Sequence, residues 1–320
     1  MLEGAIGKAA EREGCNICLI VLPNPLKTQY KRLKTTALLK YRIVCQMTTE
    51  NTLRKNNLRS IATKILLQII AKRGNTLWVP KIPSGVSEAM MLAFETVKAG
   101  KLTTLGMCAT LNKTFSSIYS KTETFESIER KFSTMTKLTL SAVEAYAHRN
   151  KQPPEEVLVF NSSASNDQIK MFQEFYTIPL KEKLGEIYDK KAPLLTLVMV
   201  NVKTSERFFT EGENCRNVPA GTVVSTDIVS KNYDFYVVSQ NSNKGSIVPN
   251  HYKVISTDSK LEEGVLQELI FSQCFNYVNW TGSIKVPGIL QYAGKCARFN
   301  SEVLENEQLS EELQNKLYFV

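Results

Sequence analysis

The chain has 320 residues, 43% hydrophobic and 22% charged, with a formal net charge of +9, as expected of a globular protein with one large domain or two ordinary ones. Its seven scattered cysteines do not suit a disulfide scaffold, and its apolar runs are far shorter than the ~20 residues of a membrane helix. Because the first residues also form no apolar signal core, we expect a cytoplasmic or nuclear protein that is not secreted and spans no membrane.

The first 80 residues alternate between strand and helix patterns. Apolar runs predict strands, helical spacing of apolar residues predicts helices, and Asn24, Asn57 and Gly74 have the residue types of helix caps. The predicted elements are a strand at Asn16–Leu22, a helix at Leu26–Lys40, a strand at Arg42–Met47 and a helix at Leu58–Arg73. This order predicts a parallel sheet, in which ligands bind at the carboxyl ends of the strands.

The prolines and glycine of Trp78–Gly85 suggest a domain junction, so we divide the chain into residues 1–80 and 81–320. The second part again mixes strands with helices. Strands are predicted at Met90–Thr96, Leu105–Leu111, Thr114–Ser120, Val157–Phe160, Leu194–Val202, Gly221–Val229, Asp234–Ser239 and His251–Ser256. Helices are predicted at Phe125–Arg149, Gln168–Leu184 (interrupted by Pro179), Leu261–Asn276 and Leu304–Leu317. The fold class is therefore α/β, with two domains.

Several familiar motifs carry no function here. The pair Cys15-x-x-Cys18 leads into a strand and has no second pair, so we interpret it as structural. The sequence contains no G-x-G-x-x-G, Walker or G-x-S-x-G motif, and only two histidines. These features give no support to nucleotide-dependent enzymes or to hydrolases with a Ser-His pair.

The excess positive charge is confined to the first quarter of the chain. Residues 1–81 contain 15 Lys or Arg against 4 Asp or Glu, a net charge of +11, whereas residues 82–320 have a net charge of −2. A localised basic surface is typical of proteins that bind a polyanion, either nucleic acid or an anionic membrane. The alternative is a basic surface that merely faces water.

Within this basic region, polar residues recur at helical spacing. Tyr30 and Lys34 are four apart on one predicted helix, and Lys64, Gln68 and Lys72 form a stripe on the next. Gln46 ends the strand between them. An aromatic ring, lysines and amides at the ends of parallel strands would suit a phosphate with a stacked base. The alternative is again that the lysine stripe faces water.

The chain resembles the MID and PIWI domains of the Argonaute superfamily, and the Piwi clade in particular. The matching segments occur in the family's order: SIATKILLQIIAKRG (60–74), RFF (207–209), PAGTVV (219–224), YDFYVVSQ (233–240), GSIVPNHYKV (245–254), NWTGSIKVPGILQYA (279–293) and LYFV (317–320). The resemblance covers Asn16 to the last residue and does not include the family's N-terminal and PAZ domains. It implies a Rossmann-like MID domain at residues 1–80 and a ribonuclease H-like PIWI domain at residues 81–320.

The resemblance also implies a role for the basic region. In this family the MID domain binds the 5′-phosphate and first base of a single-stranded guide RNA. The family's binding set matches Tyr30, Lys34, Gln46, Gln68 and Lys72. In Piwi-type proteins the terminal carboxylate, here that of Val320, also helps to hold the phosphate. It does so through a divalent cation such as Mg²⁺, for which Gln68 is the other candidate ligand in this chain.

The family's nuclease site is altered in this sequence. Slicing requires Asp, Asp and His or Lys, which hold two metal ions. The matching positions are Glu95, Ser162 and Gly294. Glutamate is one methylene longer than aspartate, serine provides no carboxylate, and glycine has no side chain to coordinate a metal. Glu123 lies near the expected fourth position, and Asp167 is expected to face elsewhere. We therefore expect no slicing and no catalytic metal.

Three functions remain open. The first is binding of a small guide RNA, piRNA-like, and silencing of a complementary target RNA without cutting it. The second is an RNA-guided endonuclease with a displaced metal site. The third is a PIWI module that has lost RNA and binds tryptophan-bearing partner proteins, as the surface of this domain does in the family. The matched phosphate set favours the first.

Overall fold

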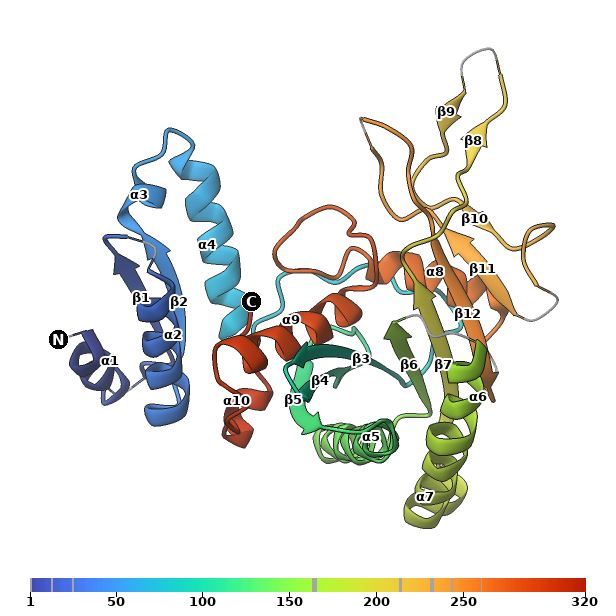
Figure 1. Ribbon diagram of the computed structural model, residues 1–320, viewed down its shortest axis with the longest axis horizontal. Coiled ribbons are helices and arrows are strands. Elements are labelled where there is room, and N and C mark those ends of the chain that lie inside the picture. The colour runs from blue at the N-terminus through green and yellow to red at the C-terminus, as the bar shows by residue number, and fades with distance from the viewer. Residues whose placement is uncertain are drawn as a thin grey trace.

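The computed structural model describes residues 2–12, 14–24, 26–162, 166–212, 215–230, 233–242, 244–259 and 261–320, with residues 166–168 described by their backbone alone. The described residues form a small two-stranded sheet, a large eight-stranded sheet and a separate two-stranded hairpin (Figure 1). None of the helices in these ranges is long and apolar enough to cross a membrane.

The small sheet belongs to the basic first part of the chain. Strands β1 (Ile17–Leu22) and β2 (Val44–Thr49) pair in parallel, as predicted. The helices around them are α1 (Leu2–Ala10), α2 (Lys27–Thr35) with a π-helical turn at Thr36–Lys40, α3 (Glu50–Leu53) and α4 (Leu58–Lys72). Gly74, at φ +85°, follows the end of α4, because a left-handed residue there favours glycine.

The beginning of α2 differs from the prediction. Leu26, in an extended conformation, is its N-cap, and the helix starts at Lys27. Asn24 therefore does not cap it, and residue 25 lies outside the described residues. Helices α1 and α3 were not predicted, because α1 is rich in glycine and alanine and α3 is a single turn.

The large sheet has the strand order β10-β11-β12-β7-β6-β3-β4-β5. Strand β3 pairs in parallel with β6 and antiparallel with β4, so the predicted strands at Met90–Thr96 and Val157–Phe160 are neighbours in the interior of the sheet. The strands are β3 (Ala89–Ala99), β4 (Leu102–Thr110), β5 (Ile118–Phe125), β6 (Glu156–Ser162), β7 (Leu194–Asn201), β10 (Val223–Val224), β11 (Asp234–Val237) and β12 (Asn250–Thr257). The hairpin consists of β8 (Phe209–Thr210) and β9 (Arg216–Asn217).

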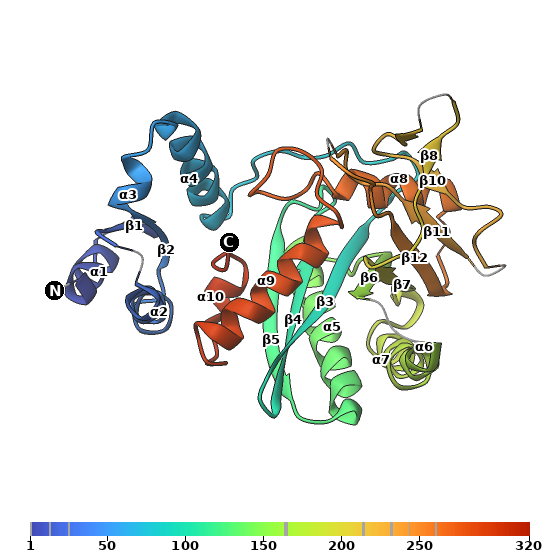
Figure 2. The ribbon, with the colours of Figure 1, turned by 45° about the horizontal axis from the view of Figure 1, so that its top comes forward.

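Helices cover both faces of this sheet (Figures 1 and 2). On one face lie α8 (Glu263–Gln273), α9 (Gly288–Glu302) and α10 (Glu311–Gln314), and on the other lie α5 (Ile128–Asn150), α6 (Asn166–Phe172) and α7 (Ile178–Tyr188). Residues of β3 alternate between the two cores: Met91 and Ala93 belong to the first, Met90 and Leu92 to the second.

Two contacts place α9 and the basic part relative to the sheet. Helix α9 crosses β4 so closely that a Cβ at Gly106 would stand 2.6 Å from the carbonyl oxygen of Ala293, so only glycine fits there. Leu38, Val44 and Ala71 of the basic part belong to the same buried cluster as β3 and α9. Both parts of the chain therefore contribute to one common core, although β1 and α2 also form a small core of their own.

Three predicted elements were displaced or shortened. The strand predicted at Thr114–Ser120 begins only at Ile118, because the Asn112 side chain accepts hydrogen bonds from the backbone of Ser116 and Ser117 and closes a turn. The helix predicted at Leu304–Leu317 is reduced to α10, since left-handed residues occur at Glu305 and Asn306. The strand predicted at Gly221–Val229 is reduced to β10.

The helix predicted at Gln168–Leu184 is divided into α6, a π-helical turn at Gln173–Thr177 and α7. Pro179 is the second residue of α7, where a proline is tolerated. Helix α9 was not predicted as an element at all.

Candidate nucleic-acid interface

The basic part contains a chain of hydrogen bonds among the predicted phosphate-binding side chains. The Lys72 ammonium donates to Gln46 Oε1 over 2.6 Å, and Gln46 Nε2 donates to Gln68 Oε1 over 2.8 Å. Gln68 Nε2 in turn donates to Asn279 Oδ1 over 3.0 Å, which joins α4 to the loop before α9. The side chains of α4 and β2 are therefore positioned by one another and by the second part of the chain.

Tyr30 and Lys34 lie on the facing helix α2. The Lys34 ammonium donates to the carbonyl oxygen of Cys45 over 2.7 Å and lies 5.7 Å from the centroid of the Tyr30 ring. It also lies 5.9 Å from the Phe299 ring of α9. Lys34 is 2% exposed, whereas Tyr30 is 36% exposed, so the ammonium is buried while the tyrosine reaches the surface.

The lysine stripe on α4 runs from the interior to the surface. Lys72 is 2% exposed, Gln68 is half-buried and Lys64 is exposed. The alternative of a stripe that simply faces water is therefore wrong for Lys72. A buried lysine next to other lysines is costly unless an anion compensates it.

The electrostatics of the pocket favour an anion. Burial, together with the positive charges of Lys34 and Lys295, lowers the pKa of Lys72 to about 6. Burial also lowers the pKa of Lys34, and it raises that of the Tyr30 hydroxyl to about 12. In the free pocket Lys72 is therefore mostly unprotonated at neutral pH, and a bound anion would favour the protonated form of both lysines.

Sequence reasoning missed several residues of this pocket. The residues that were missed are Asn279, Lys295 and Phe299. All three lie more than 200 positions after Lys72 in the sequence and reach the pocket because the two parts pack on a common core. The single available signal was that Asn279 begins one of the segments that match the family. We call the cluster of Tyr30, Lys34, Gln46, Gln68 and Lys72 the phosphate pocket, after the role that the resemblance implies for it, with Asn279 and Lys295 at its edge.

The last residue lies near this pocket. In both ribbon views the C-terminus is found beside the C-terminal end of α4 (Figures 1 and 2). Val320 is half-buried, packs against the common core, and donates its backbone N–H to the carbonyl oxygen of Leu317 over 3.2 Å. The side-chain amide oxygen of Gln68 and the carboxylate of Val320 are the oxygen ligands that Mg²⁺ prefers. Because the Gln68 oxygen already accepts from Gln46, a cation there would replace that hydrogen bond.

The three positions that the resemblance matches to the family's nuclease site meet at the end of the large sheet. Glu95 of β3 and Ser162 of β6 lie on the face that α9 covers, and the Ser162 hydroxyl donates to the Glu95 carboxylate. A Cβ placed on Gly294 of α9 would stand 3.6 Å from Glu95 Cγ, an ordinary van der Waals contact. The structure thus brings three residues from distant segments into one cluster.

The environment of Glu95 differs from that of a metal ligand in a carboxylate cluster. Burial raises the pKa of Glu95, while the Ser162 hydroxyl, the Thr96 backbone and the Lys131 ammonium partly oppose this. Lys131, on α5, lies 4.9 Å from the Phe172 ring. Among the described residues, no group of three or more His, Cys, Asp and Glu side chains gathers to hold a metal ion.

Of the two further acidic candidates, Glu123 does not join this cluster. Glu123 lies on β5 and pairs with Lys137 of α5 at 2.7 Å, on the opposite face of the sheet from Glu95. The side chain of Asp167 lies outside the described residues, so the expectation about it stays a prediction.

Two other features carry no chemistry. Cys18 is buried in β1, where burial and the nearby Cys15 and Cys45 raise the pKa of its thiol to about 11, so it stays protonated, as expected for a structural residue.

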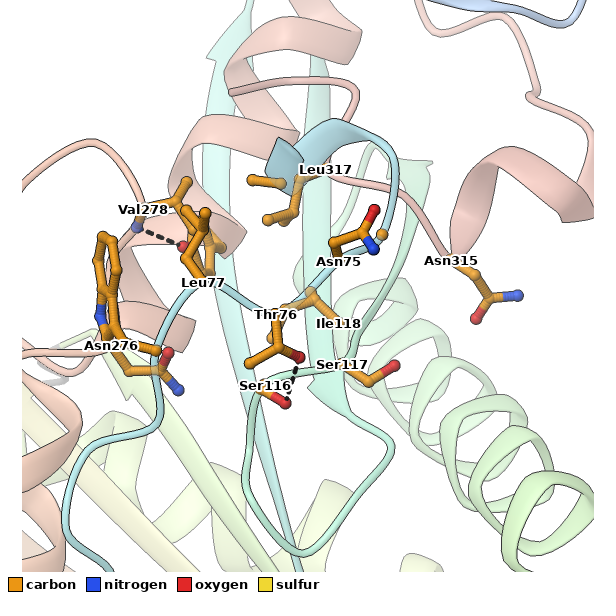
Figure 3. Close-up of a pocket in the computed structure, with 14 residues that line it drawn as sticks. Asn75, Thr76, Leu77, Ser116, Ser117, Ile118, Asn276, Val278, Asn315 and Leu317 are labelled. Carbon is orange, nitrogen blue, oxygen red and sulfur yellow. Dashed lines mark hydrogen bonds between the residues drawn. The ribbon is translucent and has the colours of Figure 1, made fainter. Parts of the chain in front are cut away.

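A cavity between the end of α4 and the β4–β5 turn is lined by amide, hydroxyl and apolar groups, among them Asn75 and Thr76 (Figure 3). None of its lining residues is charged, so it does not suit a phosphate.

Comparison with known proteins gives consistent matches. A family model described as the Piwi domain matches residues 17–305. The chain is 28% identical to Protein piwi of Drosophila melanogaster, over 89% of this chain and 34% of that protein. It is also 28% identical to Piwi-like protein 1 of Gallus gallus, over 95% of this chain and 36% of that protein. The chain spans about a third of the length of these curated relatives.

Solved structures give the same result. The crystal structure of Drosophila Piwi matches with a TM-score of 0.87 and 26% identity, over 99% of this chain and 44% of that one. Kluyveromyces polysporus Argonaute with a guide RNA matches with a TM-score of 0.80 and 18% identity, over 99% of this chain and 43% of that one, a likeness of fold. With the Piwi-domain match over most of its length and its ribonuclease H-like large sheet, the chain belongs to the Piwi family of the Argonaute superfamily.

Proposed function

We propose that this chain binds the 5′ end of a single-stranded small guide RNA, piRNA-like, and uses that guide to hold and silence a complementary target RNA without cutting it. The observation that carries the proposal is the phosphate pocket, in which two buried lysines and two glutamines from three elements converge beside an accessible tyrosine. The basic charge of residues 1–81 supplies a wider field that attracts the rest of the RNA.

Each pocket residue has a distinct role in this proposal. Tyr30 stacks on the first base, since its ring is partly exposed. Lys34 and Lys72 neutralise the 5′-phosphate through charge-assisted hydrogen bonds, and Gln46 and Gln68 donate their amide N–H groups to it. The phosphate replaces the Cys45 carbonyl and the Gln46 amide oxygen as the acceptor for the two ammonium groups.

A divalent cation at the phosphate is part of the same proposal. Gln68 and the Val320 carboxylate would hold Mg²⁺, which would supply positive charge next to the phosphate oxygens. The proposal needs no catalytic metal.

The proposal excludes slicing on chemical grounds. Glu95 keeps a carboxylate, but its partner at the second position is the Ser162 hydroxyl, which donates a hydrogen bond to it instead of coordinating a metal. Gly294 offers no ligand at all. The positive charge of Lys131 lies near the carboxylate that remains, where it opposes the approach of two dications.

Target retention tests the guide role. We expect chain loaded with a 5′-phosphorylated guide to retain a complementary RNA on a filter, to release it at full length, and to retain a scrambled RNA only weakly. Sequence-specific retention requires pairing with the guide, whereas the basic field alone binds every RNA alike. Equal retention of complementary and scrambled RNA would contradict the guide role and favour a module that binds partner proteins.

Proton uptake provides a separate prediction. At about pH 8 a 5′-phosphate is a dianion, because its second pKa is about 6. Lys72 in the free pocket, with a pKa of about 6, is then mostly neutral, and a bound dianion favours its protonated form. Binding should therefore take up a proton, and affinity should fall as pH rises above about 6.

Calorimetry in two buffers of different ionisation enthalpy measures this uptake. We expect the buffer dependence to disappear in Lys72→Met, which keeps the volume of the side chain without its charge. Proton release on binding, or an unchanged buffer dependence in that variant, would show that Lys72 does not face the phosphate.

A further inference from the structure

An exposed tryptophan lies directly beside the phosphate pocket. Trp280, in the loop between α8 and α9, is 52% exposed. The Lys64 ammonium of α4 lies 6.0 Å from the centroid of its ring. A flat ring with a lysine at its side is the combination that proteins use to hold single-stranded nucleic acid, because bases stack on the ring and the ammonium contacts the backbone.

The position of this pair is continuous with the pocket. Trp280 follows Asn279, which accepts the hydrogen bond from Gln68 at the pocket edge. Lys64 precedes Gln68 by four residues on α4, so it lies about 6 Å further along the same helix face. Both ribbon views show the α8–α9 loop approaching α4 (Figures 1 and 2). A strand anchored at Lys72 and Gln68 can therefore continue over Lys64 and Trp280.

The loop fixes where the ring lies. A Cβ at Gly282 would stand 2.9 Å from Trp280 Nε1, so the indole lies against a glycine that leaves it room. The backbone N–H of Trp280 donates to the carbonyl oxygen of Tyr277 over 3.1 Å, and the Asn279 side chain donates to the Tyr277 hydroxyl over 3.3 Å. These two hydrogen bonds hold the loop on either side of the ring, so little ordering of the loop is needed when a base stacks on it.

We propose that Trp280 and Lys64 form a second nucleotide subsite, in which Trp280 stacks on a guide base beyond the first and Lys64 contacts the adjoining backbone phosphate. This inference rests on the proposed function for the direction of the strand. The recognition is tolerant of base identity, because every base presents a π-face to the ring. It gives a role to Lys64, the exposed lysine of the α4 stripe, which is not part of the phosphate pocket.

Affinities for ligands of two lengths test the subsite in the full chain. The probes are uridine 5′-monophosphate, which fills only the phosphate pocket, and a 5′-phosphorylated single-stranded RNA decamer. We expect Trp280→Ala to weaken decamer binding about tenfold, as loss of one stacked base does, and to leave monophosphate binding unchanged. Trp280→Phe should keep most of the decamer affinity. The matched control is Leu66→Ala, which removes an exposed apolar side chain from α4. This variant should bind both probes normally.

Fluorescence supplies a second readout that does not depend on variant stability. The chain has two tryptophans, and the other, Trp78, is half-buried with its Nε1–H donating to the Phe275 carbonyl oxygen. Decamer should quench the emission of the unmodified chain, and Trp280→Phe should lose most of that quenching.

The outcomes separate this inference from the proposed function. Normal decamer affinity in Trp280→Ala, with phosphate-dependent binding intact, would overturn the subsite and leave the pocket standing. The exposed ring would then be a candidate contact for a protein partner. A second outcome combines two results: Trp280→Ala weakens decamer binding, and the unmodified chain binds 5′-phosphorylated and 5′-hydroxyl RNA equally. The first result would support the stacking subsite, and the second would contradict the pocket. Equal losses for monophosphate and decamer would overturn the assignment of Trp280 to a later nucleotide.

Discussion

The double variant Tyr30→Ala, Lys72→Ala is expected to bind 5′-phosphorylated single-stranded RNA on the order of a hundredfold more weakly than the unmodified chain. Stacking on an aromatic ring contributes about 1–3 kcal/mol by truncation, and a charge-assisted hydrogen bond contributes about 1.5–3 kcal/mol. The two side chains reach the pocket from α2 and α4, and Tyr30 is not part of the hydrogen-bonded chain Lys72–Gln46–Gln68, so their losses should largely add.

Filter binding measures the loss, with thermal melts to show that the variants fold. The matched control is Lys55→Ala, which removes one exposed positive charge from the same basic region without touching the pocket. It should weaken binding slightly and equally for 5′-phosphorylated and 5′-hydroxyl RNA. Lys72→Met should reproduce the loss from Lys72→Ala without leaving a cavity. Equal losses for both kinds of RNA in the double variant would mean that these residues form a general basic surface.

Guide-loaded chain is expected to leave a complementary target uncut in Mg²⁺ or Mn²⁺. Two-metal cleavage needs carboxylates that bridge both ions, and among the three matched positions only Glu95 has one. The Ser162 hydroxyl donates a hydrogen bond to that carboxylate, and Gly294 has no side chain that could bind a metal ion. Gel analysis of an end-labelled target over hours measures cleavage directly. Metal-dependent cutting that Glu95→Ala abolishes would establish an endonuclease with a displaced metal site instead.

Restoring the family's metal ligands at the three matched positions gives a second test of the nuclease site. The variant Glu95→Asp, Ser162→Asp, Gly294→His should regain traces of metal-dependent cleavage, since a Cβ at Gly294 fits beside Glu95 at an ordinary contact distance. Adding Lys131→Gln should increase it, because that change removes a positive charge near the metal site. The single variant Gly294→His, which restores one ligand without the carboxylates, is the control and should remain inactive.

The sequence predicted the arrangement of the sheet better than the helices around it. The apolar run at Met90–Thr96 predicted the strand itself, but Met90–Phe94 are all apolar and buried, so which residue faces which core follows only from the structure. Helix α9 escaped notice since its glycines and the preceding Pro287 weaken a helical pattern that tertiary packing stabilises. The predicted helix at Leu304–Leu317 failed for the opposite reason: its composition suits a helix, but left-handed residues at Glu305 and Asn306 end it.

Helical spacing pointed to four of the five residues of the phosphate pocket. Tyr30 with Lys34, and Gln68 with Lys72, share helix faces as their four-residue spacing requires. Spacing could not reveal that Lys72 is buried or that Lys295 lowers its pKa, because both depend on how α9 packs against α4. Likewise, no local pattern connects Lys131 with Glu95, which approach each other only across the end of the sheet.

The affinity of the unmodified chain for one RNA carrying either a 5′-phosphate or a 5′-hydroxyl tests the central claim most directly. Filter binding across a salt series measures it, because the general basic field fades with salt whereas a buried pocket is screened much less. If the pocket holds the 5′ end of a guide, the phosphorylated RNA should bind at least about tenfold more tightly, and this ratio should persist at high salt. Identical affinities for the two RNAs at every salt concentration would contradict the account.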